Sequence, residues 1–550
     1  MKTLLTALSI FISINVYSQN ITNTIGIGGL YTIKDASTNY LTLSQSTGNV
    51  NLLRSLRLEN TTSSNLGIIF KGTDRFLHNF GSGNTFLGVS SGNFTMTGIN
   101  NTAVGVQSLF SNTSGFGNTA LGFQSLVSNT GGVDNTAIGV AALFSNSSGS
   151  SNTALGLNSL YSNIDGYSNT AVGWNSLALN TNGFENTAVG NQSLYSNITG
   201  DGNTAVGKES LKSNTLGDNN SAFGFQSLMS NTSGVYNSAF GYSSLHSNTN
   251  NNNSAFGFAS LYYNSSGNSN SAFGTTSLYT NTTGYENSAF GYQSLYTIST
   301  GYSNSAFGNK SLHFNTGVNN SAFGSVSLYT NTTGFENSSF GNVSLYSNTT
   351  GNKNCAFGFN SGFAITTGSN LTCLGYNTQP TSGSATNQIT LGDGNVTSLR
   401  CNVTTITSLS DARDKKNIKD LSLGIDFIMK IKPRLFNWDK REWYDNNISD
   451  GSKMKDVPTA GFIAQELDEV QTTENAEFLN LVLKDNSEKL EATYGNLLPV
   501  MVKAIQDLEA ENLQLKNTNE ETVQRVLKLE QALNVVLSEL AKTKILSIKY

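Results

Sequence analysis

Between Gly88 and Gly375, apolar and polar positions recur along the chain with a period of 17 residues. Each unit reads Asn-(Thr/Ser)-Ala-(Val/Phe)-Gly-x-x-Ser-Leu, and a polar stretch that ends in glycine follows. The alanine two residues before the first glycine and the leucine four residues after it hardly vary. The period is shortened by one residue at two places. The glycines stand at positions 88, 105, 122, 139, 156, 173, 190, 207, 224, 241, 257, 274, 291, 308, 324, 341, 358 and 375.

This period predicts a mainly β fold, in which each unit forms one rung of a parallel β-roll or β-solenoid. Seventeen residues are too few for a βαβ unit, and the turn residues leave room for two strands of about four residues. Each rung would pair with the next. The leucines predict a core ladder, and the asparagines at the turns can form amide ladders. Eighteen rungs at about 4.8 Å would give a rod on the order of 85 Å.

The two residues that flank the fixed alanine vary together along the array. Early rungs pair threonine with an aliphatic residue, as in Thr102 and Val104, whereas rungs from Ser221 onward pair serine with phenylalanine. Residues two apart share one face of a strand. The exchange keeps the total volume roughly constant, which favours a close-packed interior. Duplication within one half of the array would give the same pattern.

The remaining segments differ from the array in pattern. Residues 19–83 contain short alternating runs that predict a β-rich N-terminal region, and residues 84–377 are the repeat itself. Pro380 breaks the array, and residues 378–409 are predicted as a β stem or linker. Residues 410–550 contain apolar and aromatic residues for a separate α+β core.

From about residue 499, apolar residues fall at the a and d positions of a heptad repeat, which predicts a coiled-coil helix. Asn512 and Asn519 occupy a positions, where polar residues specify register and oligomer state. The alternative is a single helix folded back on its own core. The apolar positions are Ile505, Leu508, Leu515, Val526, Leu529, Leu533, Val536 and Leu540.

The first 18 residues have the pattern of an export signal. Lys2 precedes an apolar run from Leu4 to Val16, and small residues precede a cleavage position after Ser18. The run is too short to span a bilayer. We therefore expect an exported protein, secreted or at the cell surface, with no integral membrane segment after signal cleavage.

Composition excludes several other functions. The net charge is −5 and only 12% of residues are charged, so the basic patch that nucleic-acid binding requires is missing. Cys355, Cys373 and Cys401 form no disulfide framework. The three histidines are scattered, so we expect no metal site and no cofactor. A Gly-x-Ser-x-Gly match at residues 88–92 lies inside the repeat and lacks the strand–turn–helix context of a hydrolase.

Candidate chemistry lies where the weakly charged array gives way to the charged C-terminal region. Ser410 and Lys415 are five residues apart. A lysine can act as the base for a serine nucleophile when burial lowers its pKa. Such a charged stretch is otherwise typical of a solvated turn or helix start.

The residues from this point onward carry three motifs in order. The first comprises Ser410, Asp411, Arg413, Lys415 and Ile418; the second is Ala464-Gln465-Glu466; the third comprises Tyr494, Leu497 and Pro499. Together they resemble the intramolecular chaperone domain of phage tail spikes and fibres, the peptidase S74 family, over residues 410–550.

This resemblance implies a domain that trimerises, guides folding of the preceding fibre and then cuts itself off. The scissile bond would be Leu409–Ser410, with Ser410 as nucleophile and Lys415 as base. Asp411, Arg413, Gln465 and Glu466 would be supporting residues. The activity would be single-turnover self-cleavage, and no multiple-turnover enzyme is expected.

The Asn-Ser-Ala-Phe-Gly units resemble the head repeats of trimeric autotransporter adhesins of the YadA kind. This resemblance implies a homotrimer of left-handed parallel β-rolls that serves surface adhesion or display, with a surface glycan or host receptor as partner. Tyrosines after the core leucine could bind sugars or pack between chains: Tyr161, Tyr195, Tyr279 and Tyr329. The alternatives are a receptor-binding protein like a phage tail fibre, which the export signal disfavours, and an ice- or glycan-binding rod.

Overall fold

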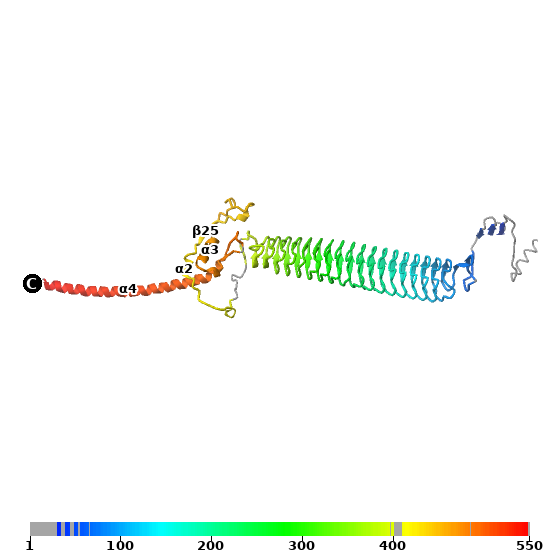
Figure 1. Ribbon diagram of the computed structural model, residues 1–550, viewed down its shortest axis with the longest axis horizontal. Helices are drawn as coiled ribbons and strands as arrows, with labels where there is room; N and C mark the ends of the chain where they lie inside the picture. Colours follow the sequence, from blue (N-terminus) through cyan, green and yellow to red (C-terminus); the bar gives the residue numbers. More distant parts are fainter. Residues whose placement is uncertain are drawn as a thin grey trace, which may run out of the picture. The chain divides into compact units, whose positions relative to one another are not determined.

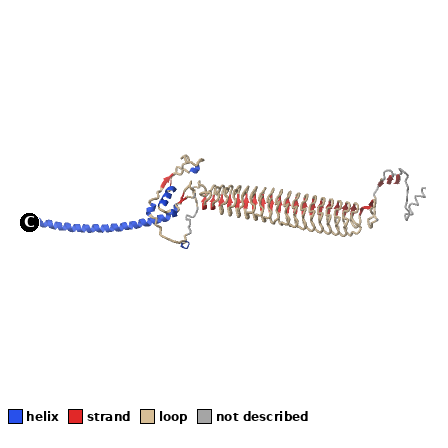
Figure 2. Ribbon diagram, in the orientation of Figure 1, coloured by secondary structure: helices blue, strands red, loops and turns tan. Residues whose placement is uncertain are grey.

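The computed structural model describes residues 30–34, 39–44, 49–52, 56–64, 66–396, 398–400, 410–484 and 486–547. The fold is mainly β, as predicted: a β-solenoid of 17-residue repeats, then a small α/β region that ends in a long helix (Figures 1 and 2). The chain divides into two compact units, residues 1–236 and 237–550. The predicted signal peptide, Cys401 and Leu409 lie outside the described residues.

Unit 1 begins with short antiparallel strands. Strands β1 to β3 form a three-stranded meander. Strands β4 and β5 form a hairpin, and β5 pairs antiparallel with β6, the first strand of the solenoid. The hairpin thereby covers the open edge of the parallel stack, an edge that could otherwise pair with another chain. The bounds are β1 Leu30–Lys34, β2 Asn39–Ser44, β3 Val50–Leu52, β4 Ile69–Lys71, β5 Asp74–His78 and β6 Thr85–Leu87.

The first rung differs from the others in its interior. Phe86 stands where later rungs have alanine, and it is completely buried. Gly92 stands where later rungs have leucine, and a Cβ there would lie 2.7 Å from the Phe86 ring. The large and small residues have exchanged places, so the Phe86 ring fills the space that a leucine side chain fills in later rungs.

The remaining rungs of unit 1 each contribute one three-residue strand to a parallel sheet. Identical positions pair, for example Thr153 with Thr170 and Ala154 with Ala171. The strands are β7 Thr102–Val104, β8 Thr119–Leu121, β9 Thr136–Ile138, β10 Thr153–Leu155, β11 Thr170–Val172, β12 Thr187–Val189, β13 Thr204–Val206 and β14 Ser221–Phe223.

The prediction of two strands per rung is wrong. After each three-residue strand the backbone turns repeatedly, because two non-glycine residues adopt positive φ: Gln107 (58°) and the core residue Leu109 (52°) in one rung, with equivalents throughout. Such a conformation costs a leucine roughly 1–2 kcal/mol. Complete burial of the side chain, which contributes about 1.5–3 kcal/mol, offsets that cost.

The interior of each rung confirms the predicted ladders. The alanines and leucines are fully buried. Two rows of buried asparagines run beside them. In the first row, Asn135 Nδ2 donates to Asn118 Oδ1 (3.0 Å) and to the Gly149 carbonyl (2.9 Å). In the second, Asn146 Nδ2 donates to Asn129 Oδ1 (2.8 Å). Each asparagine side chain therefore links adjacent rungs.

Asn146→Ala should destabilise the solenoid. The change leaves Asn129 Oδ1 without a donor, removes one of the two donors of the Gly149 carbonyl, and removes one of the two acceptors of Asn163. A buried group left unsatisfied costs about 1–3 kcal/mol, so we expect a loss of about 2 kcal/mol. Ser148→Ala, at an exposed position of the same rung, is the control. Denaturant midpoints that are equal for the two variants would contradict this account of the ladder.

Unit 2 continues with the same kind of rung. The strands are β15 Ser238–Phe240, β16 Ser254–Phe256, β17 Ser271–Phe273, β18 Ser288–Phe290, β19 Ser305–Phe307, β20 Ser321–Phe323, β21 Ser338–Phe340, β22 Cys355–Phe357, β23 Ser369–Leu374 and β24 Thr386–Leu391. They pair in parallel and in register from β15 to β24.

The covarying serine and phenylalanine positions do not lie in the interior, so that interpretation is wrong. In each strand the central residue is buried, whereas its two neighbours are half-exposed on the outer face. The phenylalanine rings stack from rung to rung, with centroids 4.7 Å apart for Phe240–Phe256 and 4.6 Å apart for Phe340–Phe357. Side chains alternate in direction along a strand, so the central alanine points into the interior and its two neighbours point outward. The variation therefore changes the outer surface of the strands.

A second row of stacked rings follows the core leucines of unit 2. Neighbouring rings are nearly parallel, for example Tyr279–Tyr296 at 4° and Tyr296–His313 at 6°. Stacked rings cover one another's faces, so the row offers mainly ring edges to a ligand. The full row is His246, Tyr262, Tyr279, Tyr296, His313, Tyr329, Tyr346 and Phe363.

Acid should weaken unit 2 through His313. Burial lowers the pKa of this imidazole, the charge of Lys310 also lowers it, and a hydrogen bond with the Gln293 carbonyl opposes the shift. As pH falls below about 6.5, the unfolded chain binds the proton before the folded chain does, so stability decreases. His313→Tyr should reduce the loss of stability between neutral and acidic pH, whereas Tyr329→Phe should leave it unchanged. Parallel pH profiles of the unfolding midpoint for wild type and His313→Tyr would contradict this.

The α/β region of unit 2 has its own core. Its buried members are Phe427, Ile431, Leu467, Ala476, Leu481, Val482, Leu497 and Val500. Its elements are η1 Ala412–Asp414, α2 Ile425–Ile428, β25 Arg434–Phe436, η2 Arg441–Trp443, β26 Thr459–Gly461, α3 Ala464–Thr473, η3 Glu477–Leu479, β27 Val482–Leu483, β28 Glu491–Ala492, η4 Tyr494–Leu497 and α4 Leu498–Ser547. The pairs β25–β26 and β27–β28 are antiparallel.

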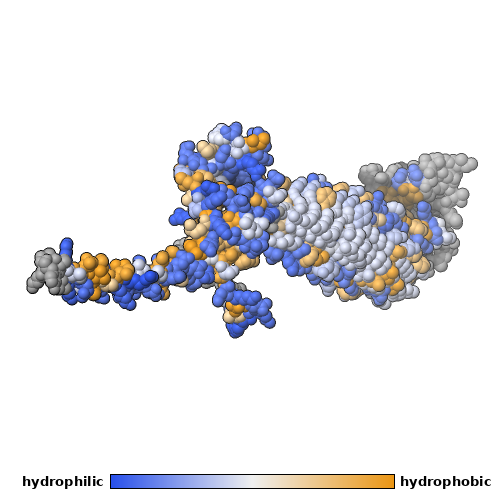
Figure 3. Space-filling view, turned by 60° about the vertical axis from the view of Figure 1, so that its left-hand side comes forward, coloured by the Kyte–Doolittle hydropathy of each residue, from blue (hydrophilic) through white to orange (hydrophobic). Residues whose placement is uncertain are grey.

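Helix α4 packs on this core only through its first turns. Val500 and Ala504 are buried. The eight predicted a and d residues from Ile505 to Leu540 are between 48% and 70% exposed, and apolar surface is visible along the helix in Figure 3. A helix folded back along its whole length on its own core is therefore excluded for a single chain.

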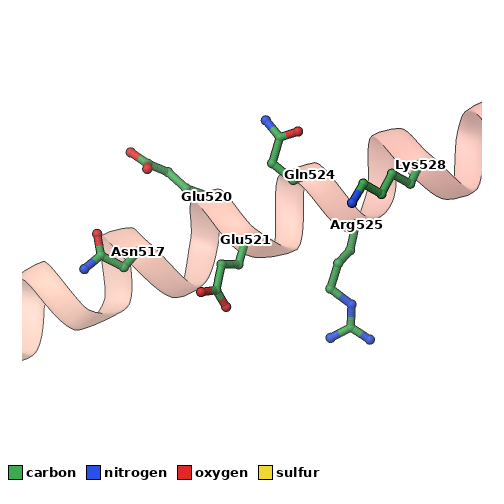
Figure 4. A pocket seen from close by; sticks show the side chains of 6 residues that line it. All are labelled: Asn517, Glu520, Glu521, Gln524, Arg525 and Lys528. Atoms are coloured by element: carbon green, nitrogen blue, oxygen red, sulfur yellow. The ribbon is translucent and has the colours of Figure 1, made fainter.

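The opposite face of α4 is polar. A shallow concavity on this one helix is lined by six polar residues, whose side chains extend outward from the helix (Figure 4). They are Asn517, Glu520, Glu521, Gln524, Arg525 and Lys528. With Ile505 at an a position, these residues fall at b, c, f and g positions. The helix is thus amphipathic with a heptad period.

Candidate functional site

Ser410 and Lys415 are brought together by the short helix η1. The Asp411 carboxylate caps this helix by accepting a hydrogen bond from the Arg413 backbone N–H (2.8 Å). At its other end, the Lys415 N–H donates to the Ala412 carbonyl (3.2 Å). The resulting turn places Lys415 Nζ where it donates a hydrogen bond to Ser410 Oγ.

The neighbouring Asp411 and Arg413 form a bidentate ion pair. Arg413 Nε lies 3.1 Å from each carboxylate oxygen, and Nη2 lies 2.6 Å from Oδ2. The Arg413 hydrogen bonds hold the pKa of Asp411 below its usual range, and the carboxylate raises the pKa of Arg413. Asp411 is thus both helix cap and partner of the guanidinium.

Residues 410–420 are exposed throughout. A lysine that acts as a base needs burial to lower its pKa, and a single chain does not provide that burial in the part that the structure describes. The residues are arranged as a serine–lysine pair, but solvent still reaches both side chains.

Gln465 and Glu466, at the start of α3, lie apart from this pair. Glu466 accepts a hydrogen bond from Arg434 Nε (2.9 Å), which lowers the pKa of its carboxyl group. Gln465 is exposed. Among the described residues, no hydrogen bond or ion pair joins either of them to Ser410 or Lys415. In a single chain, Glu466 connects α3 to β25.

Tyr494 contributes a contact to which sequence reasoning assigned no role. Its hydroxyl lies 3.2 Å from the Phe462 nitrogen and 3.3 Å from the Phe462 carbonyl oxygen, and the two rings meet edge to face at 5.1 Å. The contact joins the segment before α3 to the segment before α4. Both residues stand in or beside the quoted motifs, but their pairing, 32 residues apart, has no signal in the sequence.

Metal sites and membrane-spanning helices are both missing from the described residues. No group of three or more histidine, cysteine or acidic side chains there is arranged to hold a metal ion. No helix of the described chain is long and apolar enough to cross a membrane.

Comparison with protein families gives one match. The family model Peptidase_S74, described as chaperone of endosialidase, matches residues 410–476. The matched segment begins at Ser410 and includes the serine–lysine pair, Gln465 and Glu466; it lies outside the repeats. The predicted resemblance to this family is thereby confirmed for residues 410–476. Searches of curated proteins and of solved structures found no significant match.

Proposed function

We propose that this protein is an exported homotrimeric β-solenoid fibre whose C-terminal region, residues 410–550, directs trimer assembly and then cuts itself off before Ser410. The observation that carries the proposal is the match of residues 410–476 to a chaperone family, immediately after a β-solenoid in the chain. Three features of the described residues support it: the exposed stripe of α4, the apolar outer face of the solenoid strands, and the Ser410–Lys415 contact.

Helix α4 is the assembly element. Its a and d side chains are exposed in a single chain, and a contiguous apolar stripe of this kind marks an interaction surface. Burial of a leucine or valine contributes about 1.5–3 kcal/mol, so eight positions per chain supply a strong driving force. Asn512 and Asn519 at a positions would fix register and chain number, as polar a residues do in coiled coils.

A charge at a d position of α4 should abolish the trimer. Leu529 is 70% exposed, so Leu529→Asp is tolerated by a single chain but would place a carboxylate in the coiled-coil core. We expect more than a tenfold loss of trimer in analytical ultracentrifugation, measured in a Ser410→Ala background that keeps α4 attached. Gln524→Asp, on the polar face, is the matched control. A trimer that survives Leu529→Asp would refute α4 as the assembly element.

The outer strand face is the proposed interface along the fibre. It carries apolar side chains that a single chain leaves half-exposed or exposed, among them Leu121, Leu155 and Phe357. In unit 2 these side chains form the stacked phenylalanine row. Three such faces around a common axis would bury these rows, in line with the resemblance of the repeats to trimeric adhesin heads.

Self-cleavage would proceed by an acyl shift. The Lys415 amine accepts the Ser410 hydroxyl proton, and Oγ attacks the carbonyl carbon of Leu409. The C–N bond breaks, the Ser410 nitrogen takes a proton to become an amine, and Leu409 remains as an ester on Oγ. Water then hydrolyses this ester, which leaves a carboxyl group on Leu409 and restores the Ser410 hydroxyl. Because both side chains are exposed in a single chain, we infer that trimer assembly supplies the burial and that cleavage follows assembly.

The released fibre would act in surface adhesion or structural display, with a glycan or host receptor as its ligand. The predicted signal peptide supports export. A receptor-binding protein like a phage tail fibre is the second candidate, and the chaperone-family match favours it. The two candidate functions differ in whether the chain is exported across a membrane. A mature N-terminus directly after Ser18 would show that the predicted signal was removed during export.

A further inference from the structure

The turn that joins Ser410 to Lys415 contains a carboxylate that could compete for the lysine. Asp411 lies between the two residues in the sequence, and a free carboxylate near an amine stabilises the ammonium form. An ammonium group cannot accept the serine proton. In the structure, however, Lys415 Nζ bonds to Ser410, and none of the ion pairs among the described residues includes it.

Arg413 accounts for this arrangement. Three hydrogen bonds from its guanidinium group and one from its backbone N–H occupy the Asp411 carboxylate. Both carboxylate oxygens thus accept hydrogen bonds from Arg413. Their capacity for a further cation is correspondingly reduced, since a carboxylate has about four acceptor sites.

We propose that Arg413 is a positioning residue for self-cleavage: it holds the Asp411 carboxylate at the cap of η1, so that the Lys415 amine stays available to Ser410 Oγ. This inference rests on the proposed self-cleavage. The remaining charged groups of the turn are Asp414 and Lys416, and no other element of the described chain forms an ion pair with Lys415. Among the described residues, Asp411 is the carboxylate with which Arg413 forms an ion pair.

A purely structural role for Arg413 predicts a different result. An exposed ion pair contributes little to stability. If Arg413 only stabilised the turn, its replacement would lower the cleavage rate by the same factor at every pH. Release of a competing carboxylate would instead shift the pH at which the neutral amine forms. Removal of that carboxylate would then reverse the shift, and asparagine at position 411 can still cap the helix.

The experiment measures the cleavage rate of full-length chain made in a cell-free extract and transferred to buffers from about pH 6 to about pH 10. The chains are wild type, Arg413→Gln, Asp411→Asn, and the double variant. Arg413→Gln should cleave about tenfold more slowly at neutral pH and regain the wild-type rate in alkali, because the freed Asp411 carboxylate favours the ammonium form of the lysine. Asp411→Asn and the double variant should share one pH profile, because the carboxylate that Arg413 holds is missing from both.

The first outcome below tests the proposed self-cleavage, and the others test the role of Arg413. Absence of cleavage in the wild type would refute the proposed self-cleavage itself. Wild-type cleavage with an unshifted Arg413→Gln profile would overturn the role of Arg413. So would an Arg413→Gln variant that is slow at every pH and is not rescued by Asp411→Asn, because misfolding or a structural role would give that result. Loss of cleavage in Asp411→Asn alone would also overturn it, since Asp411 would then be required rather than restrained.

Discussion

Ser410→Ala and Lys415→Ala should each leave a single full-length chain where the wild type gives two fragments. Ser410→Ala removes the attacking oxygen, and Lys415→Ala removes the only side chain that hydrogen-bonds to that oxygen among the described residues. Loss of a nucleophile or its base typically lowers a rate by several orders of magnitude, so cleavage should be undetectable. Denaturing gels and intact mass spectrometry measure this directly.

Lys416→Ala is the matched control, because Lys416 is the adjacent exposed lysine. It should cleave at the wild-type rate. Cleavage of Ser410→Ala at the same bond would show that another group is the nucleophile. Cleavage of Lys415→Ala would show that the Lys415 amine does not act as the base.

A chain that ends at Leu409 should fail to form trimers when it is made without the C-terminal region. The rungs are nearly identical, so three chains displaced by one repeat lose few contacts, and long-range pairing of this kind is slow and prone to error. A C-terminal trimer would raise the local concentration of the three chains and align their ends. The same residues released by self-cleavage should instead form a trimer that resists heat and detergent, a form of kinetic stability.

The comparison requires both samples to have the same sequence and to differ only in how they were made. Trimer yield is read by ultracentrifugation of the soluble fraction and by gels run with and without boiling. Equal trimer yields from the truncated chain and from the self-cleaved chain would show that residues 410–550 are not a chaperone.

The solenoid core was predictable because its signal is repeated. A leucine and an alanine at fixed places in each 17-residue unit required ladders, and the buried rows of Leu109 and Ala103 equivalents confirm them. The strand content of a rung was not predictable, because nothing in the sequence shows that a leucine adopts a φ near 52°. The outward direction of Phe256 and its equivalents was also missed, since alternation along a strand does not say which face is interior.

At the candidate site, sequence spacing worked over short range and failed over long range. Ser410 and Lys415 meet because one capped turn spans the five residues between them. The pairing of Glu466 with Arg434 across 32 residues depends on the fold of the domain and leaves no local signal. Exposure of the serine–lysine pair was unexpected, because the spacing of two residues does not show whether they are buried or which chain would bury them.

The most direct test of the account is the mass of the purified protein under denaturing and native conditions. We predict two polypeptides on denaturation, one of which begins at Ser410, and a native complex that contains three copies of the fragment ending at Leu409. A single uncut polypeptide that is monomeric under native conditions would contradict both the assembly and the cleavage on which the account depends.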